Sequence, residues 1–311
     1  MKFFITGGAG FIGSHVVDAL LSKGEVTAYD NLTSGSLDHL TGHLGSPAFR
    51  FVKGDLKDLR DLVKAMQGHD VVFHFASNPD IARGIKETDL DIREGTYLTY
   101  NVLEAMRINK ICAILYTSGS GVYGDVGTFP TAENFGPLLP ISLYGASKLA
   151  CEALISAFCH LFEIRSYIFR LANVVGQRQT HGVAYDFIQR LRKNPNELVV
   201  FGDGTQSKSY IHVDDAIAAM LFVFERATER VNIFNVATGD YVDVNTIARA
   251  VLEEMGLGQV KIQYSGGDRG WKGDVPKVRF NLGKIEALGW RAKSTSLQAI
   301  RRSIREMLDG G

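Results

Sequence analysis

The sequence predicts an α/β protein in which a doubly wound parallel sheet is joined to a smaller, interleaved C-terminal α/β lobe. First, short β-branched or aromatic segments alternate with longer amphipathic segments through the first half, as in βαβ units. Second, the segment Val71-Val-Phe-His-Phe-Ala is apolar except for its histidine, which is typical of a strand covered on both faces. Third, this alternation is lost after Asn173, where Gly- and Asn-rich turns begin.

The alternation predicts where the strands and helices of the first half lie. Strands are expected over residues 2–6, 25–29, 49–53, 71–76, 113–117 and 165–171. Helices are expected over residues 13–23, 59–66, 95–107 and 144–160.

Two parts of the chain are predicted from this pattern. Residues 1–173 form the sheet domain, and residues 210–237 return to it through one amphipathic helix and one strand. Residues 174–209 and 238–311 form the smaller lobe.

The composition argues against several classes of protein. Lys plus Arg and Asp plus Glu are equal at 34 each, so no overall field favours nucleic acid or an anionic membrane. No apolar stretch reaches membrane-spanning length, and the early glycine motif leaves no room for a signal peptide. Cys112, Cys151 and Cys159 have no metal-ligand spacing. We therefore expect a cytoplasmic protein without a metal, a nucleic-acid partner or a membrane partner.

A glycine-rich turn, Thr6-Gly-Gly-Ala-Gly-Phe-Ile-Gly, lies between a predicted strand and a predicted helix. In this setting Gly7 permits a tight turn, Gly10 lets backbone N–H groups approach a pyrophosphate, and Gly13 lets helix and strand pack closely. Asp30 ends the next strand about 20 residues later, where its carboxylate can accept both ribose hydroxyls. Because that carboxylate repels a 2′-phosphate and no Arg follows it, NAD is favoured over NADP. The alternative is an ordinary glycine-rich turn.

The first domain is therefore predicted to be an NAD-binding Rossmann domain. Asp55 is expected beside the adenine, although a helix N-cap is its ordinary alternative. The expected NAD contacts are Gly7, Gly10, Phe11, Ile12, Gly13, Asp30, Asn31, Ser34, Asp55, Leu56, Phe75, Ala76, Ser77, Thr117, Tyr144, Lys148 and Leu171.

Tyr144 and Lys148 are separated by four residues at the start of a predicted helix, which places them on one face. A lysine ammonium beside a phenol stabilises the phenolate, so Tyr144 is a candidate acid/base. Such pairs are also common on helices without any catalytic role. Upstream, Ser118 and Ser120 end a strand and are candidate hydrogen-bond donors to the same reacting oxygen, with a polar turn as the alternative.

Taken together, these motifs resemble the extended short-chain dehydrogenase/reductase family and its NAD-dependent epimerases and dehydratases. The resemblance covers nearly the whole chain and rests on residues 6–13, Asp30, Val122-Tyr-Gly, residues 144–148 and Arg170-Leu-Ala-Asn-Val-Val-Gly. Pro140-Ile-Ser-Leu-Tyr-Gly-Ala-Ser-Lys and Tyr210-Ile-His-Val-Asp-Asp are most similar to the archaeal type of UDP-glucose (UDP-galactose) 4-epimerase.

The resemblance implies tightly retained NAD, Tyr144 as acid/base, Lys148 as its electrostatic partner, and a homodimer formed by pairing helices. Three departures from the family stand near the expected site. Gly119 replaces the usual catalytic Ser or Thr, Gly121 replaces a frequent hydroxyl residue, and Gly95 replaces an Asn. We expect Ser118, Ser120 or a water to supply the missing hydrogen bond.

The resemblance also implies a UDP-sugar site, formed by residues of the lobe and by the two residues that flank its segment 174–209. Its expected residues are Asn173, Arg178, Lys208, Tyr210 and Arg269. An Arg guanidinium suits phosphate because its planar fork donates two hydrogen bonds at once. Solvated surface loops are the alternative for the charged residues among them.

The expected activity is interconversion of UDP-glucose and UDP-galactose through transient oxidation at C4. A UDP-glucuronate or UDP-N-acetylhexosamine 4-epimerase is one alternative. A nucleotide-sugar dehydratase or decarboxylase is another, although Ser120-Gly stands where a dehydratase usually has an acidic pair. A non-catalytic NAD-binding sensor is the third, because of Gly119 and Gly121.

Overall fold

The computed structural model describes residues 1–81 and 83–309. By its contacts the chain divides into two parts, each made of three segments. The first part comprises Met1–Gly119, Leu143–Arg170 and Met220–Phe234, and the second comprises Ser120–Ser142, Leu171–Ala219 and Asn235 to the end of the described chain. The second part is thus interleaved with the first along the sequence.

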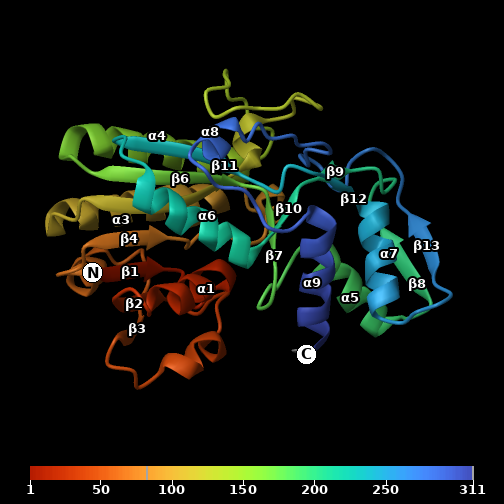
Figure 1. The fold of residues 1–311 in the computed structure, drawn as a ribbon, viewed down its shortest axis with the longest axis horizontal. Helices are drawn as coiled ribbons and strands as arrows, with labels where there is room; N and C mark the ends of the chain where they lie inside the picture. The colour runs from red at the N-terminus through yellow and green to blue at the C-terminus, as the bar shows by residue number, and fades with distance from the viewer. Residues whose placement is uncertain (82, 310–311) are drawn as a thin grey trace. The chain divides into compact units, whose positions relative to one another are not determined.

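A seven-stranded sheet forms the centre of the first part, with the strand order β11-β6-β5-β4-β1-β2-β3 (Figure 1). The strands are β1 (Lys2–Thr6), β2 (Glu25–Asp30), β3 (Phe49–Lys53), β4 (Val71–His74), β5 (Ala113–Gly119), β6 (Arg165–Leu171) and β11 (Val231–Val236). The pairs β1–β2, β2–β3, β1–β4 and β4–β5 are parallel. Their register sets Thr6 beside His74 and His74 beside Tyr116, at the carboxyl ends of neighbouring strands.

Helices cover both faces of this sheet, which confirms the predicted doubly wound Rossmann architecture. The helices are α1 (Phe11–Leu20), α2 (Leu59–Met66), α3 (Tyr97–Asn109), α4 (Leu143–Phe162) and the end of α6 (Val213–Arg226). Buried side chains of α2, α3 and α4, such as Met66, Val102 and Ile155, form one core with the sheet. On the other face, Phe224 of α6 packs edge-on against Phe73 and Tyr167.

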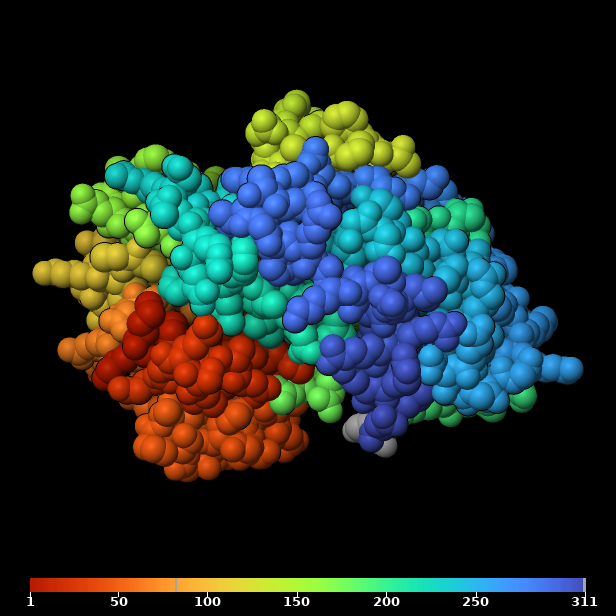
Figure 2. Space-filling view, viewed as in Figure 1, coloured from red at the N-terminus to blue at the C-terminus, as the bar shows by residue number. Residues whose placement is uncertain are grey.

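The second part contains a helical layer and three short strand pairs (Figure 1). The strands are β7 (Asn173–Val175), β8 (Glu197–Val200), β9 (Ser207–Lys208), β10 (Tyr210–His212), β12 (Val242–Asp243) and β13 (Lys261–Tyr264). Helices α5 (Val183–Lys193), α7 (Val244–Glu254) and α9 (Ser296–Asp309) share one apolar core, and a short helix, α8 (Gly283–Ala287), precedes α9. In Figure 2 the residues of α7 and α9 form adjoining areas of the visible surface, in light and dark blue.

Several element boundaries differ from the predicted ones. Strand β4 ends at His74 instead of residue 76, and β5 continues to Gly119. The helix expected over 95–107 begins at Tyr97, because Ile92–Thr96 forms a π-helical turn before it. Residues 120–142 group with the second part because Thr131 forms backbone hydrogen bonds with Arg279 and Asn281.

No helix in the described part of the chain is both long and apolar enough to cross a membrane.

Candidate cofactor and active site

The glycine turn between β1 and α1 is shaped for close approach of another group. Gly7 has a φ of 68°, and its N–H donates to the Tyr29 carbonyl at 2.9 Å. A Cβ at Gly13 would lie 2.1 Å from the Gly7 carbonyl oxygen, so only glycine lets α1 pack this closely. Gly10 is the N-cap of α1 and provides no side-chain cap, which leaves the first N–H groups of the helix for a phosphate.

Asp30 lies at the end of β2, next to this turn. Its two carboxylate oxygens accept hydrogen bonds from the N–H groups of Ala9, at 3.0 Å, and Leu32, at 2.8 Å. These bonds fix the carboxylate while each oxygen retains a lone pair for a ribose hydroxyl. The geometry therefore suits the adenosine half of NAD.

Residues after β3 and β4 extend the same region. The backbone N of Ala76 lies 2.8 Å from the position of a Cβ on Gly7, so the segment after β4 runs directly against the glycine turn. Asp55 accepts a hydrogen bond from Asn31 at 3.3 Å. The alternative assignment of Asp55 as a helix N-cap is wrong, because the N-cap of α2 is Asp58.

Tyr144 and Lys148 lie on α4 with the lysine ammonium close to the phenol ring. Lys148 Nζ is 5.4 Å from the centroid of the Tyr144 ring and 4.9 Å from that of Tyr116. It donates a hydrogen bond of 2.8 Å to the carbonyl oxygen of Thr117 on β5. Lys148 is only 5% exposed, whereas Tyr144 is partly accessible. The helix thus presents a reachable phenol beside a buried positive charge.

Ser118 follows Thr117 on β5 and is 5% exposed. Its hydroxyl has no hydrogen-bond partner among the described residues. A buried hydroxyl without a partner usually indicates a water or ligand that completes it. Ser120 belongs to the second part and begins a 3-10 turn, Ser120–Tyr123.

In the second part, two of the predicted substrate cations are held by carboxylates. Lys208 Nζ lies 2.6 Å from Asp274 Oδ1. Arg269 donates to the Asp274 carbonyl oxygen and to Asp125 Oδ2, both at 2.6 Å. Sequence reasoning missed Asp125 and Asp274, because their pairing depends on contacts between distant loops.

The other predicted substrate residues lie in the same part. Asn173 is paired with Tyr210 in the parallel register of β7 and β10. Arg178 has a left-handed backbone, with a φ of 66°. Burial, and secondarily the charge of Asp274, raise the pKa of Tyr210, so its phenol stays neutral.

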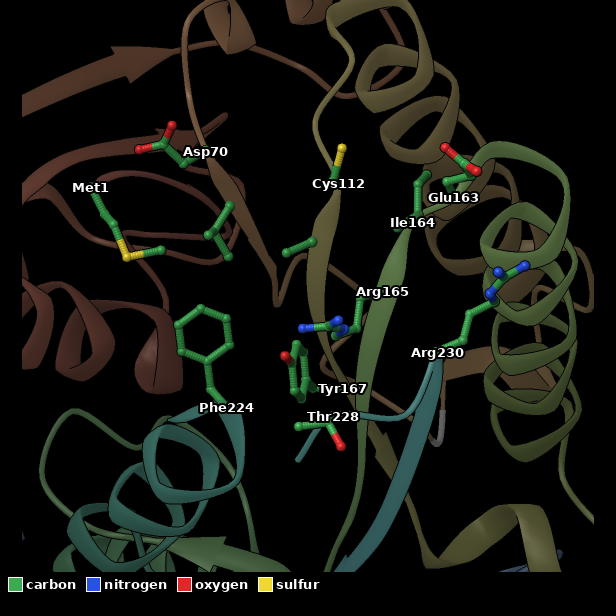
Figure 3. Close-up of a pocket in the computed structure, with 12 residues that line it drawn as sticks. Met1, Asp70, Cys112, Glu163, Ile164, Arg165, Tyr167, Phe224, Thr228 and Arg230 are labelled. Carbon is green, nitrogen blue, oxygen red and sulfur yellow. The ribbon is translucent and has the colours of Figure 1, made fainter. Parts of the chain in front are cut away.

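The first part has a surface hollow of about 720 Å³ whose lining does not include the glycine turn, Asp30, Tyr144 or Lys148 (Figure 3). Its lining includes the residues just before five strands, namely Met1, Asp70, Cys112, Ile164 and Arg230. It is therefore at the amino ends of the strands, whereas open α/β sheets bind ligands beyond the carboxyl ends. The glycine turn, Asp30 and Lys148 are at those carboxyl ends, which makes them the candidate cofactor site.

A Rossmann sheet with this glycine turn and a Tyr-Lys pair defines a nucleotide-cofactor enzyme of the short-chain dehydrogenase/reductase class. The chain belongs to the NAD dependent epimerase/dehydratase family, whose family model matches residues 3–237. NAD is the cofactor of this family, and the predicted resemblance is confirmed.

Relatives extend the match to the whole chain. A putative UDP-glucose 4-epimerase of Methanocaldococcus jannaschii is 33% identical over 97% of both chains. A solved UDP-galactose 4-epimerase is 38% identical, with a TM-score of 0.87 over 100% of this chain and 99% of that one. A dTDP-glucose 4,6-dehydratase of Streptomyces venezuelae, solved with NAD, is 26% identical, with a TM-score of 0.92 over 99% of this chain and 97% of its own.

Proposed function

We propose that the chain is a UDP-hexose 4-epimerase that interconverts UDP-glucose and UDP-galactose. The observation that carries this proposal is the Tyr144–Lys148 pair, with its ammonium 5.4 Å from the phenol ring, in a chain of this family. Similarity to UDP-glucose and UDP-galactose 4-epimerases along the full length supports the choice of substrate.

In this proposal Tyr144 takes the proton of the sugar 4-hydroxyl and later returns it. Lys148 favours the phenolate form that accepts this proton, because a nearby positive charge stabilises a negative one. The unpartnered hydroxyl of Ser118 would hydrogen-bond the same sugar oxygen. NAD, when bound, supplies the hydride acceptor and donor.

The first domain would hold NAD through residues 1–173 and 210–237. The N–H groups at the start of α1 would bind its pyrophosphate, and Asp30 would bind the adenosine ribose. The other residues predicted from the sequence to contact NAD, Leu171 and Ser34 included, would also line this NAD site.

The lobe, residues 174–209 and 238–311, would hold the UDP-sugar. Epimerisation requires the sugar to turn over while the nucleotide stays bound, so firm contacts are needed on the pyrophosphate. Arg269, Lys208 and Arg178 of the lobe supply positive charge, and Asn173 and Tyr210, which flank its segment 174–209, supply further polar groups. Asp125 and Asp274 would release the two cations they hold when the pyrophosphate binds.

A nucleotide-sugar dehydratase is the second candidate, favoured by the similarity to the dTDP-glucose 4,6-dehydratase. Elimination needs an additional acid and base, and Ser120-Gly stands where such enzymes usually have an acidic pair. The epimerase is therefore the better proposal. The remaining alternatives are 4-epimerases of UDP-glucuronate or UDP-N-acetylhexosamines, a decarboxylase, and a sensor without turnover.

We also propose that the protein is a homodimer in the cytoplasm. An aromatic patch on α3 and α4 comprises Tyr97, Tyr100, Phe158 and Phe162, whose successive ring centroids are 6.2, 6.4 and 5.1 Å apart. Tyr100 is 41% exposed and the adjacent Leu161 is 71% exposed, as expected for a face that a second copy covers. The three free cysteines are consistent with a reducing compartment.

The function is tested by product analysis. Purified protein is incubated separately with UDP-galactose, UDP-glucuronate, UDP-N-acetylgalactosamine and dTDP-glucose, and the products are resolved by chromatography and NMR. We expect fastest conversion of UDP-galactose to UDP-glucose. A 4-keto-6-deoxy product would establish the dehydratase instead, and protein that retains NAD without turning over any substrate would establish the sensor.

A further inference from the structure

We infer that Tyr116 is a positioning residue. Its ring face holds the Lys148 ammonium close to Tyr144, where the ammonium stabilises the Tyr144 phenolate. The inference rests on the proposed role of Lys148 in the epimerase reaction. It assigns a task to a buried tyrosine that neither the glycine turn nor the Tyr-Lys motif includes.

Lys148 places a positive charge at a buried position. A buried ammonium is unfavourable unless neighbouring groups replace its lost hydration. The hydrogen bond to the Thr117 carbonyl replaces part of it. In the part of the chain that the structure describes, no carboxylate forms an ion pair with Lys148. Another source of negative potential is therefore needed.

The ring of Tyr116 supplies that potential. Its centroid is 4.9 Å from Lys148 Nζ, nearer than the 5.4 Å to the Tyr144 ring. Both distances are within the roughly 6 Å over which the negative face of an aromatic ring attracts a cation. Tyr116 is 2% exposed, so water does not weaken this attraction.

The ring of Tyr116 is held on two sides. On β4, the strand beside it, His74 is its register partner, and the two rings are 5.6 Å apart. His74 is itself fixed by Thr6 Oγ1 at 2.7 Å and Thr99 Oγ1 at 3.0 Å. The Tyr116 hydroxyl hydrogen-bonds Cys151 on α4, and burial raises the pKa of Tyr116, so the ring remains a neutral phenol.

A ring face suits this position better than a carboxylate does. A carboxylate would neutralise the ammonium and occupy its N–H groups. The ring face compensates the charge but accepts none of the classical hydrogen bonds, so the N–H groups not used by Thr117 stay available. Tyr116 therefore fixes Lys148 without reducing the field that Lys148 exerts on Tyr144.

Substitutions at residue 116 separate the ring face from the hydroxyl. Tyr116→Leu removes both, Tyr116→Phe removes only the hydroxyl, and Cys151→Ala removes the partner of the hydroxyl. We expect Tyr116→Leu to lower kcat on the order of tenfold, because one desolvated cation–π contact is lost. The KM of this variant should stay within about twofold of the wild-type value. The rising limb of its kcat–pH profile should move to higher pH. Tyr116→Phe and Cys151→Ala should stay within about threefold of the wild-type kcat.

A second replacement guards against simple misfolding. Pentafluorophenylalanine in place of Tyr116 has nearly the shape of phenylalanine, but its ring face is positive. We expect it to lower kcat as Tyr116→Leu does, with unchanged melting temperature and NAD content. Equal kcat values and pH profiles for Tyr116→Phe, Tyr116→Leu and the fluorinated protein would overturn the inference.

The position of Lys148 is also measured without turnover. In lysine-labelled protein, NMR relaxation should show the Lys148 side chain to be less ordered in Tyr116→Leu than in Tyr116→Phe, because only the second variant keeps the ring 4.9 Å from Lys148 Nζ. Equal order of Lys148 in the two variants contradicts the inference. Wild-type protein that turns over no substrate contradicts the proposed function alone, because the relaxation measurement still reports on Tyr116.

Discussion

Arg269 and Asp125 are 144 positions apart in the sequence, and their side chains form a 2.6 Å hydrogen bond from Nη2 to Oδ2. Asp125 follows the Val-Tyr-Gly segment, and Arg269 lies in the loop expected to contact the UDP pyrophosphate. The bond therefore occupies an Arg269 N–H group that, in the proposed function, would donate to the nucleotide.

Loss of the Asp125 carboxylate should strengthen nucleotide binding. We expect Asp125→Asn to lower the Kd for UDP by about threefold, because Arg269 then binds UDP without first breaking an ion pair. We expect Arg269→Ala to raise the Kd by about tenfold or more. Isothermal titration calorimetry measures both. Glu87→Gln, which breaks the exposed Arg83–Glu87 pair, is the matched control and should leave the Kd unchanged. Weaker UDP binding by Asp125→Asn would show that Asp125 orients Arg269 instead of competing for it.

The hydroxyl groups near Gly119 should decide the speed of the reaction. Ser118 is buried and its hydroxyl lacks a partner among the described residues, so Ser118→Ala should lower kcat by roughly ten- to a hundredfold. Adding Gly119→Ser to this variant should restore part of the rate. Steady-state assays with UDP-galactose measure both effects, and a wild-type rate for Ser118→Ala would exclude Ser118 as the donor.

His74 should make the fold sensitive to acid. Burial, and then the charge of Lys148, lower the pKa of His74 to about 3. Between that pH and about 6.5, His74 is neutral in the folded protein but takes up a proton in the unfolded chain. Protonation of His74 therefore does not lower the free energy of unfolding above about pH 6.5. As the pH decreases from there towards 3, this free energy falls by at most about 1.4 kcal/mol per pH unit.

Urea unfolding between pH 4 and pH 7 checks this dependence. The unfolding free energy of His74→Gln should change less steeply with pH than that of the wild type. His160→Gln, at an exposed position on α4, is the control and should keep the wild-type slope. Equal slopes for His74→Gln and the wild type would contradict the prediction.

The aromatic patch on α3 and α4 should determine the oligomeric state. Tyr100→Asp places a charge in the centre of the patch and should convert the proposed dimer to a monomer, as measured by light scattering with size-exclusion chromatography. Phe129→Asp, at an exposed residue of the second part, should leave the dimer intact. A dimeric Tyr100→Asp protein would place the interface elsewhere.

The features that sequence spacing predicted well are local ones. The glycine turn, Asp30 at the end of β2, and the close approach of Lys148 to Tyr144 depend on one strand, one turn or one helix, where residue periodicity determines geometry. The sheet architecture followed from alternating patterns for the same reason.

The features that sequence reasoning missed depend on contacts between distant segments. Tyr116 lies under Lys148 because β5 and α4 pack together, and His74 lies beside Tyr116 because of the register of β4 and β5. Neither relationship follows from the spacing of one motif. The π-helical turn before α3 was also missed, because no residue pattern marks it.

The acid/base role of Tyr144 is the central claim, and Tyr144→Phe tests it most directly. UDP-galactose conversion is measured for the wild type and Tyr144→Phe at equal NAD content, which is determined from the denatured protein. The account predicts that removing one hydroxyl lowers turnover by at least roughly a hundredfold while NAD content and UDP affinity stay unchanged. A variant that converts UDP-galactose at the wild-type rate would contradict the account.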